Sequence, residues 1–551
     1  MTLIEQAEAW RDQDPDNNTR DALDQLLVQA QAGDPTVSQP ALDELQKIFS
    51  GPLVFGTAGL RGPLGPGPGQ MNRVVVSQTA AGFAAWLKKT GNVGGKVIIG
   101  YDARYNSEIF AKDSAEIMIG AGFEVLLSAE PVPTPVVAFG IKHFGCVAGI
   151  VVTASHNPPT DNGYKIYLGD GSQIIPPTDT EIAAEIAAVA AQPLSDIPRG
   201  SGWQEVDEEL ISAYQTRAIS LLPEMAPRNI SWVYTPMHGV GARVVSRVVA
   251  AAGFPAAIEV AEQIAPDPDF PTVSFPNPEE PGAIDLALAL AKEQGADLVI
   301  ANDPDADRCA VAAPVAGTWR MLTGDELGAI LGEDAIRRGV SGTFACSVVS
   351  STMLGDMAKA NNRPFTTTLT GFKWIGRVPD LAFGYEEAIG YCCDSAAVPD
   401  KDGITALLQV LRIAAELKAN GKTLSDRLDE IAETYGIYTT SQLSARVKDL
   451  AIISNAMDRI RSNPPSSLLK RPVTFRDLKN GGDLPATDAV ELVGDYLRIV
   501  VRPSGTEPKL KCYLQFQVPV EQSKSNLSAA RHQANQMLDE LRSEMTKILG
   551  L

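Results

Sequence analysis

Cysteine is scarce in this sequence and is not arranged in pairs. The 551 residues include six cysteines, and none of them forms a CxxC spacing, so neither a disulfide framework nor an oxidising compartment is indicated. Long apolar runs are also missing. No stretch approaches the roughly 18 apolar residues of a membrane span, and the N-terminus has no basic region followed by an apolar one. We therefore expect a cytoplasmic protein.

Positive charge is in deficit. The chain has 47 lysines and arginines against 67 aspartates and glutamates, which gives a formal net charge of −20. An acidic surface disfavours nucleic acid and anionic membranes as partners, and we expect neither. It does not exclude a small anionic substrate, because a local basic pocket can outweigh the overall field. The composition leaves the oligomeric state open.

The length predicts three or four domains, because 551 residues are too many for one hydrophobic core. Residues 1–48 are predicted to form an acidic helical arm with a break near Gly33. Further along, short apolar runs end in polar loops and several are followed by helical patterns. The predicted strands are 97–102, 150–153, 232–235 and 298–301, and the clearest predicted helices are 109–121, 283–292 and 526–547. This alternation predicts α/β domains with ligand loops at the carboxyl ends of strands.

The loop TASHNPP (residues 153–159) directly follows one of these predicted strands and places Ser155 beside His156. A serine hydroxyl is a poor nucleophile until a neighbour activates or coordinates it. An ordinary turn, in which serine and asparagine satisfy backbone groups, is the alternative. The sequence DNGYK (residues 161–165) predicts a tight turn that brings Lys165 to the same neighbourhood. Lys165 could there neutralise phosphate charge or carry a proton.

Three aspartates alternate along the loop NDPDADR (residues 302–308), after another predicted strand. Mg²⁺ binds through a few carboxylates plus phosphate oxygens, so Asp303, Asp305 and Asp307 can converge on one ion. Without a cation, three clustered like charges repel one another. This argues against a merely solvated acidic turn.

The loop RPSGTEPK (residues 502–509) has the composition of a phosphate cradle. Arg502 offers a planar fork of donors, and Ser504 and Thr506 add hydroxyls. Gly505 lets backbone amides approach an anion. The loop does not match the GxxxxGK[ST] pattern of a P-loop. Taken alone, it could equally be a hairpin turn.

Two further segments carry weaker signals. In GTAGLRG (residues 56–62) the glycines permit close backbone approach and Arg61 could meet a phosphate. In YEEAIG (residues 385–390) the adjacent glutamates could accept hydrogen bonds from sugar hydroxyls, and DKDG (residues 400–403) follows.

Taken in order, these loops resemble one family. TASHNP, DPDADR, EEAIG and RPSGTEPK are similar to motifs of the α-D-phosphohexomutase superfamily over roughly residues 50–550. GTAGLRG, DNGYKIY, GFKWIG and GYEEAIGY are most similar to its branch of phosphoglucomutase-2-type and phosphopentomutase enzymes. The resemblance implies three similar mixed-sheet α/β domains plus a smaller C-terminal α+β domain around a central cleft. The domains we expect are 1–218 (helical arm and phosphoserine domain), 219–320 (metal-binding), 321–438 (sugar-binding) and 439–551 (phosphate-binding).

The resemblance also implies residue roles. Ser155 would carry the transferable phosphoryl group, and Mg²⁺ would be bound by the phosphoserine with Asp303, Asp305 and Asp307. The other catalytic positions it implies are Arg61, His156 and Lys165. The substrate-binding positions it implies are Thr370, Gly371, Glu386, Lys401, Arg502, Ser504, Gly505 and Thr506. Ala388 stands where many members have serine, which removes one hydroxyl contact to the sugar.

The activity implied is that of a phosphosugar mutase, an isomerase of carbohydrate metabolism. Such an enzyme interconverts 1-phosphate and 6-phosphate (or 5-phosphate) sugars through a sugar bisphosphate, and glucose 1,6-bisphosphate would serve as activator. We expect phosphoglucomutase or phosphomannomutase activity first. Phosphopentomutase, sugar-bisphosphate synthase and an inactive phosphosugar-binding regulator are the alternatives, and the preferred sugar stays open.

Overall fold

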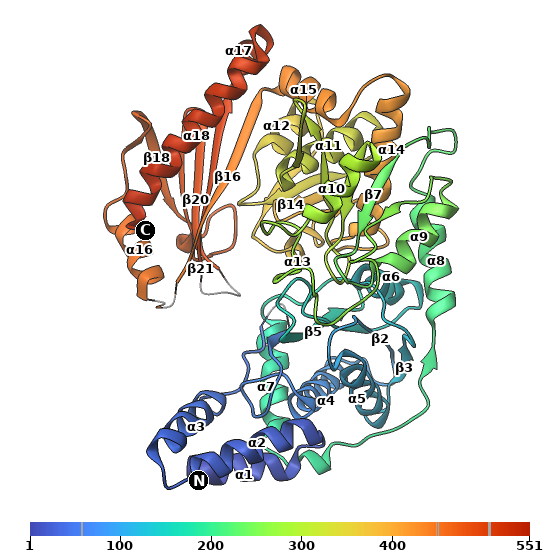
Figure 1. Cartoon of the computed structure of the whole chain (residues 1–551), viewed down its shortest axis with the longest axis vertical. Coiled ribbons are helices and arrows are strands. Elements are labelled where there is room, and N and C mark those ends of the chain that lie inside the picture. The colour runs from blue at the N-terminus through green and yellow to red at the C-terminus, as the bar shows by residue number, and fades with distance from the viewer. Residues whose placement is uncertain (57–58, 448, 450, 505–508) are drawn as a thin grey trace. The chain divides into compact units, whose positions relative to one another are not determined.

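The structure of the protein is a computed structural model that describes residues 1–56, 59–447, 449, 451–504 and 509–551. The chain divides into two compact units, whose helices and strands are labelled in Figure 1. The first unit contains Met1–Ala312 and Asp394–Arg412, and the second contains Ala313–Cys393 and Ile413–Leu551. None of the described helices is long and apolar enough to span a membrane. All six cysteines are free thiols.

The chain begins with three helices: α1 (Leu3–Gln13), α2 (Asn17–Ala30) and α3 (Pro35–Ile48). Thr2, Asp16 and Asp34 cap them by accepting hydrogen bonds from first-turn backbone N–H groups, which fixes where each helix begins. Their apolar faces pack on one another around Leu23 and Leu45. The predicted helical arm and its break near Gly33 are confirmed.

The first α/β domain is built on a six-stranded sheet in the order β1-β5-β4-β2-β3-β6. The strands are β1 (Leu60–Pro63), β2 (Lys96–Tyr101), β3 (Glu124–Leu127), β4 (Ala148–Val152), β5 (Asp161–Leu168) and β6 (Gln204–Glu205). The helices are α4 (Arg73–Lys89), α5 (Ser107–Gly120), α6 (Thr134–His143), α7 (Thr178–Ala190), the short η1 (Leu194–Asp196) and α8 (Asp207–Ile219). Strands β3, β2 and β4 run parallel to one another, and every residue of β4 is buried. Loop 153–159 therefore leaves the carboxyl end of a central strand.

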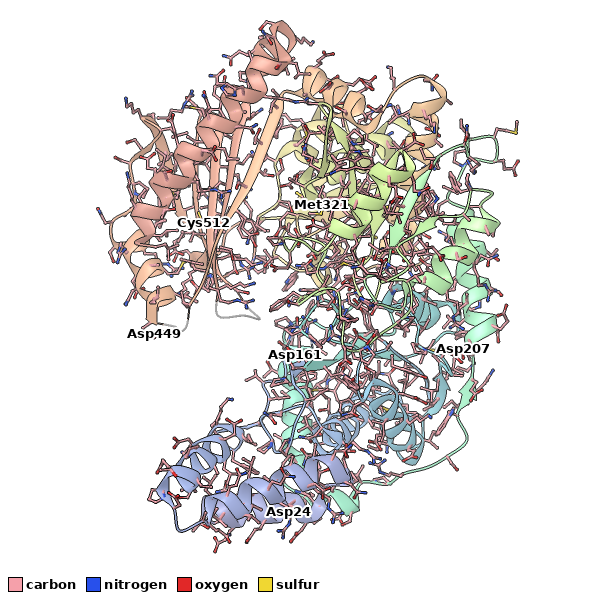
Figure 2. The ribbon with its side chains drawn as sticks, viewed as in Figure 1. Asp24, Asp161, Asp207, Met321, Asp449 and Cys512 are labelled. Atoms are coloured by element: carbon pink, nitrogen blue, oxygen red, sulfur yellow. The ribbon has the colours of Figure 1, made fainter. Side chains whose placement is uncertain are left out.

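Residues 161–165 do not form the tight turn that the sequence predicted. They begin β5, which starts at Asp161 (labelled in Figure 2) and runs antiparallel to β4 with Lys165 opposite Val151. The Asn-Gly signal was misleading because the Asn162 amide donates to the Tyr105 carbonyl oxygen instead of serving a turn. The correction matters for function, because Lys165 extends from a rigid strand and not from a loop.

The second α/β domain has a five-stranded sheet in the order β11-β10-β9-β7-β8. The strands are β7 (Trp232–Thr235), β8 (Ile258–Glu259), β9 (Leu298–Ala301), β10 (Ala310–Val315) and β11 (Thr318–Met321), and the helices are α9 (Gly241–Ala251) and α10 (Asp285–Gln294). Strands β7 and β9 are parallel and fully buried, as their apolar sequences predicted. The aspartate loop 302–308 continues directly from β9.

The third α/β domain lies mostly in the second unit and has the strand order β13-β12-β14-β15. The strands are β12 (Thr343–Ser347), β13 (Phe365–Thr368), β14 (Leu381–Glu386) and β15 (Gly390–Cys392). The helices are α11 (Gly324–Arg337), α12 (Met353–Ala360), α13 (Phe372–Ile375), α14 (Gly403–Ala419) and α15 (Leu424–Tyr435). Strand β12 is parallel to both β13 and β14, so the loops after these three strands leave the same edge of the sheet.

The C-terminal domain differs from the other three because its sheet is antiparallel throughout, in the order β16-β21-β20-β19-β18-β17. The strands are β16 (Ile437–Arg446), β17 (Ser467–Leu468), β18 (Arg471–Asp477), β19 (Val490–Gly494), β20 (Leu497–Pro503) and β21 (Lys509–Val518). The helices are α16 (Ala451–Ser462), η2 (Leu478–Asn480), α17 (Val520–Ser525) and α18 (Leu527–Leu549). The core between α18 and the sheet includes Cys512 (Figure 2). Three mixed α/β domains and one α+β domain confirm the predicted fold class, whereas the residue limits of the domains stay a prediction.

Candidate active site

Ser155 is buried in the loop after β4, with 3% of its surface exposed. Its Oγ donates a hydrogen bond of 2.8 Å to Asp303 Oδ2 and lies 3.2 Å from His156 Nδ1. Asp303 belongs to the loop after β9, so loops from the first and second sheets meet at this hydroxyl. The structure thus brings together two motifs that the sequence singled out separately.

Asp303, Asp305 and Asp307 form one buried cluster of carboxylates, whose ligand oxygens all lie within 4.8 Å of one another. Asp305 Oδ1 and Asp307 Oδ1 are buried and accept no hydrogen bond from any residue that the structure describes. Buried acceptors without a donor are costly. Hard divalent cations prefer this kind of ligand set. The cluster therefore has the composition and the open acceptors of a metal site.

The charges in the cluster are unevenly balanced. Burial, and then the neighbouring carboxylates of Asp307 and Asp305, raise the pKa of Asp303 well above its usual range. For Asp307, burial also acts to raise the pKa, but the ammonium groups of Lys165 and Lys401 outweigh it, and the pKa lies below the usual range. A bound divalent cation would relieve the penalty at Asp303.

Two lysines face the carboxylates. Lys165 Nζ donates to Asp305 Oδ2 at 2.7 Å and to Asp307 Oδ2 at 3.0 Å. Lys401 Nζ lies 3.3 Å from Asp307 Oδ2. Burial acts to lower the pKa of Lys165, but the two aspartates more than offset it, so the pKa is raised. The Lys165 ammonium is therefore charged, and Lys401, which we predicted only as a substrate ligand, adjoins the carboxylate cluster.

Arg61 and His156 are the other two predicted catalytic residues at the serine loop. Arg61, in β1, donates from Nη1 to Asn157 Oδ1 at 3.1 Å. Burial, and then the charges of Arg308 and Arg61, lower the pKa of His156 well below its usual range. Its imidazole is therefore neutral, which suits a proton acceptor beside Ser155 better than a phosphate-binding cation.

Two functional contacts were missed by the sequence reasoning. Thr134, at the start of α6, donates from Oγ1 to Asp305 Oδ2 at 2.6 Å, and its backbone N–H donates to the Asp305 carbonyl oxygen. Arg104 contacts the backbone of the serine loop. For Arg104 a signal existed, because Asp102 ends the predicted strand 97–102 and Arg104 follows it, where ligand loops are expected.

The adjacent glutamates of the third domain have different surroundings. Glu387 Oε2 accepts hydrogen bonds from Ser347 Oγ at 3.0 Å and Ser350 Oγ at 3.1 Å. Glu386 is the last residue of β14, in register with Gly390. Glu387 is thus held by hydroxyls of its own domain.

Of the other predicted substrate positions in the second unit, Thr370, Gly371 and Ser504 lie in loops. Thr370 and Gly371 precede α13, and Gly371 has φ 103°, a conformation that favours glycine. Arg502 lies near the end of β20, opposite Lys511 of β21, and the Ser504 N–H donates to the Lys509 carbonyl oxygen at 2.8 Å. Gly505 and Thr506 fall outside the described residues.

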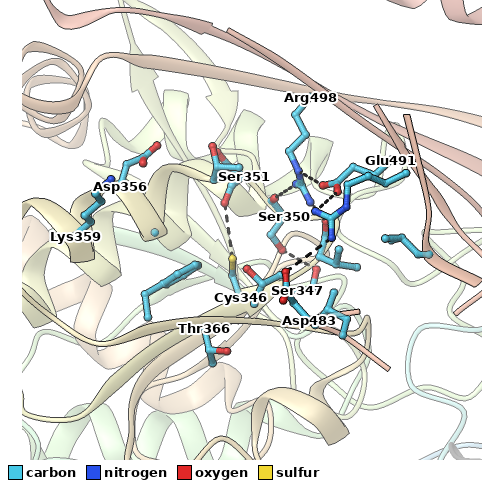
Figure 3. A pocket seen from close by; sticks show the side chains of 18 of the residues that line it. Cys346, Ser347, Ser350, Ser351, Asp356, Lys359, Thr366, Asp483, Glu491 and Arg498 are labelled. Atoms are coloured by element: carbon cyan, nitrogen blue, oxygen red, sulfur yellow. Dashed lines mark hydrogen bonds and ion pairs between the residues drawn. The ribbon is translucent and has the colours of Figure 1, made fainter. Parts of the chain in front are cut away.

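A cavity of about 680 Å³ lies within the second unit between the third and fourth domains (Figure 3). Arg498 crosses it, pairing with Glu491 at 2.8 Å and donating to the carbonyl oxygens of Val348 and Ser350. Among the described residues, none of the predicted site residues lines this cavity. The contacts of Arg498 join the third and fourth domains. Ser350, one of its partners, also donates a hydrogen bond to Glu387 in the glutamate loop.

The fold and this site define a class of protein: the chain belongs to the phosphoglucomutase/phosphomannomutase family. The family's alpha/beta/alpha domains I, II and III match residues 52–193, 211–316 and 323–435. The chain is 46% identical over 465 residues to a probable phosphomannomutase of Haemophilus influenzae, covering 81% of this chain and 92% of that protein. It is 33% identical over 577 residues to the phosphopentomutase of Homo sapiens, covering 94% and 92%. Among solved structures, parafusin, a phosphoglucomutase from Paramecium in its open form, shares the fold with a TM-score of 0.69 at 19% identity, over 90% of this chain and 95% of that one.

Proposed function

We propose that this protein is a phosphosugar mutase that passes a phosphoryl group through Ser155. The observation that carries the proposal is the contact of Ser155 Oγ with Asp303 at 2.8 Å, at the edge of a carboxylate cluster in which two buried oxygens accept no hydrogen bond from the described residues. A phosphoryl group on Oγ would place its oxygens beside that cluster. Membership of the family supports the same reaction.

We propose Mg²⁺ as the ion, held by Asp303, Asp305, Asp307 and an oxygen of the phosphoserine. The bound ion would offset negative charge on the transferring phosphoryl group. The ammonium group of Lys165 supplies further positive charge next to the proposed ion site, because it is paired with Asp305 and Asp307. Phosphoryl transfer depends mainly on such charge neutralisation and on alignment.

The proton balance can be assigned to residues of the site. When a sugar hydroxyl attacks phosphoserine 155, the P–Oγ bond breaks, a P–O bond to the sugar forms, and Oγ must gain a proton. In the opposite half-reaction Ser155 loses that proton. The neutral imidazole of His156 can accept the Ser155 proton, since its Nδ1 lies 3.2 Å from Oγ, and the imidazolium it becomes can return that proton. Arg61 and Lys165 are our candidates for the other transfers: Lys165 is charged at rest, so it would first donate a proton to Oγ and then accept the proton of the sugar hydroxyl.

The remaining predicted positions would hold the sugar and the phosphate that is not reacting. We assign this role to Thr370, Gly371, Glu386, Arg502, Ser504, Gly505 and Thr506, with Lys401 close to the transferred group. The intermediate bisphosphate must turn over so that its other phosphate faces Ser155. A distal cradle that accepts either phosphate serves this step, and it favours a mutase over a phosphatase. A sugar bisphosphate such as glucose 1,6-bisphosphate would then prime Ser155.

The substrate is a phosphohexose or a phosphopentose. A second candidate, phosphopentomutase, has its own support: the relatives that cover more than nine-tenths of this chain include a human phosphopentomutase and a probable phosphoribomutase of Schizosaccharomyces pombe. Sugar-bisphosphate synthase is a further possibility with the same site. We place the enzyme in the cytoplasm, without nucleic-acid or membrane partners.

The test combines a mass measurement with a substrate comparison. Purified protein is incubated with Mg²⁺ and glucose 1,6-bisphosphate, and the phosphate added to Ser155 is measured by intact mass and peptide mapping, with Ser155→Ala as control. Turnover is then compared for glucose 1-phosphate, mannose 1-phosphate and ribose 1-phosphate. A phosphorylated Ser155 without turnover of any of them would indicate a binding protein. Full turnover in Ser155→Ala would reject the proposal.

A further inference from the structure

Arg104 holds the backbone of the loop that carries Ser155. Its Nη2 donates to the carbonyl oxygens of Ser155 and Asn157, each at 2.6 Å. Its Nη1 donates to the carbonyl oxygens of Pro158 at 2.7 Å and Asp161 at 3.1 Å. One side chain thus satisfies four main-chain acceptors between the nucleophile and the start of β5. A planar guanidinium, with its fixed fork of donors, is suited to this task.

The charge of Arg104 is balanced by Asp102, two residues earlier. Arg104 Nε lies 3.3 Å from Asp102 Oδ2, and the two side chains are each 1% exposed. Asp102 also accepts hydrogen bonds of 2.6 Å from Thr153 Oγ1 and Ser107 Oγ. Thr153 Oγ1 in turn accepts the Ser155 N–H at 2.8 Å. The backbone of Ser155 is therefore held at both its N–H and its carbonyl oxygen.

This support matters because Ser155 has an unfavourable backbone conformation. Its φ is 51°, in the left-handed region that residues other than glycine seldom adopt. Such a conformation persists only where the surroundings hold it. The Arg104 bond to the Ser155 carbonyl oxygen acts on the very residue that is strained.

A loop of the second domain covers the guanidinium. The Phe270 ring lies 4.8 Å from Arg104 Cζ, and Tyr105, next in sequence to Arg104, donates from its hydroxyl to Asp269 at 3.0 Å. The cover keeps water from competing for the carbonyl oxygens, which strengthens the four hydrogen bonds.

We propose that Arg104 is a positioning residue for phosphoryl transfer: it fixes the main chain of Ser155 so that Oγ faces Asp303 and the carboxylate cluster. The proposal rests on the proposed role of Ser155 as the phosphoryl carrier. The two Nη atoms of Arg104 donate to backbone carbonyl oxygens of the serine loop, so the residue acts through the loop and not on the sugar. Its loss should therefore lower kcat far more than it raises KM.

Arg228 provides a matched control within the same unit. It too donates to four backbone carbonyl oxygens, those of Pro223, Ala226, Pro227 and Ala252. It also lies over an aromatic ring, with its Cζ 4.8 Å from the Phe254 centroid. Its loop precedes β7 and contains none of the site motifs. Removing Arg228 thus disrupts similar bonds without affecting the serine loop.

The experiment compares Arg104→Lys and Arg104→Met with Arg228→Lys and Arg228→Met in the full-length enzyme. Lysine keeps the charge, but one ammonium cannot serve four carbonyl oxygens in a plane. A misplacement of about 1 Å in a catalytic group can cost about a hundredfold in rate. For the Arg104 variants we expect kcat to fall about ten- to a hundredfold with KM within about threefold, and slower single-turnover phosphorylation of Ser155 by glucose 1,6-bisphosphate. The Arg228 variants should melt at lower temperature with kcat within about twofold of the unchanged enzyme.

Hydrogen exchange provides a readout that does not depend on activity. Amides of residues 153–161 should exchange faster in Arg104→Lys and at the normal rate in Arg228→Lys. If the unchanged enzyme takes no phosphate on Ser155, the proposed function is wrong. The hydrogen-exchange comparison still tests whether Arg104 positions the serine loop. Unchanged exchange in Arg104→Lys would overturn the proposal. It would also be overturned if the Arg104 and Arg228 variants lost the same amount of kcat for the same drop in melting temperature.

Discussion

Lys165 and Asp305 form a buried ion pair, with Nζ 2.7 Å from Oδ2, that joins a strand of the first sheet to the loop after a strand of the second. The same ammonium reaches Asp307 at 3.0 Å. Lys165 therefore occupies acceptor sites that a metal ion could otherwise use, while Asp305 Oδ1 and Asp307 Oδ1 receive no hydrogen bond from the described part of the chain. The lysine balances part of the negative charge and leaves the open oxygens for a cation.

This arrangement gives an unusual expectation for Lys165→Met. Because the variant loses a positive charge beside the carboxylates, Mg²⁺ affinity should stay equal or increase, whereas kcat should fall by at least about a hundredfold through lost charge stabilisation of the transferring group. Titration calorimetry with Mg²⁺ and steady-state kinetics on the same preparation check both parts. Lys292→Met, an exposed lysine in the same unit, is the control. Weaker Mg²⁺ binding with an unchanged kcat would contradict the assignment.

The carboxylates themselves should be indispensable. Asp305→Asn keeps the shape of the side chain but removes one negative charge from a site for a hard cation. We expect mutase activity to be lost at micromolar Mg²⁺ and partly restored at millimolar Mg²⁺. Exhaustive chelation of the unchanged enzyme should abolish turnover, and added Mg²⁺ should restore it. Activity that survives chelation would remove the metal from the mechanism.

Much of the site could be predicted because its motifs follow strand ends. Ser155 comes three residues after β4, and Asp303 comes two residues after β9. The apolar runs that form these strands and the polar residues that follow each run can both be recognised in the sequence. The contact between the two loops, by contrast, depends on how the two sheets pack, and no local pattern encodes it.

Where the sequence reasoning was wrong or incomplete, contacts between segments far apart in the sequence decide the structure. Asn162-Gly163 is a turn signal on local propensity, yet the two residues form part of β5 because pairing with β1 and β4 outweighs that propensity. Arg104 was missed because its four acceptors lie more than fifty residues away. The substrate role of Lys401 stays a prediction, but its closeness to Asp307 could not be predicted, because it depends on a loop that returns to the first unit.

The paired glutamates offer a test within the third domain. Glu386→Gln should raise KM about tenfold or more, because a carboxylate acceptor for sugar hydroxyls becomes a neutral amide. Glu387→Gln should lower the melting temperature and affect KM less, because Glu387 accepts hydrogen bonds from Ser347 and Ser350. Thermal melts and kinetics are measured for both variants. The reverse pattern would assign the sugar contact to Glu387.

Arg502 is the most informative residue of the fourth domain, because two interpretations of its loop predict opposite results. As part of a distal cradle, Arg502 holds whichever phosphate is not reacting. Charge-assisted hydrogen bonds are worth about 1.5–3 kcal/mol each, so Arg502→Ala should lose about ten- to a hundredfold in kcat/KM for substrates phosphorylated at either position. As part of a plain connection between β20 and β21, Arg502 would matter only for folding.

The two interpretations separate when KM and melting temperature are measured on one preparation of Arg502→Ala. The cradle predicts a raised KM for both the 1-phosphate and the 6-phosphate (or 5-phosphate) sugar, while Ser155 still takes phosphate from a bisphosphate supplied in excess. Some loss of kcat is also expected, because the distal phosphate helps to align the reacting hydroxyl. A structural turn predicts a lower melting temperature and an unchanged KM. That second result would rule out the distal cradle. The cradle is the reason to favour a mutase over a phosphatase, because a mutase must retain a bisphosphate and a phosphatase need not.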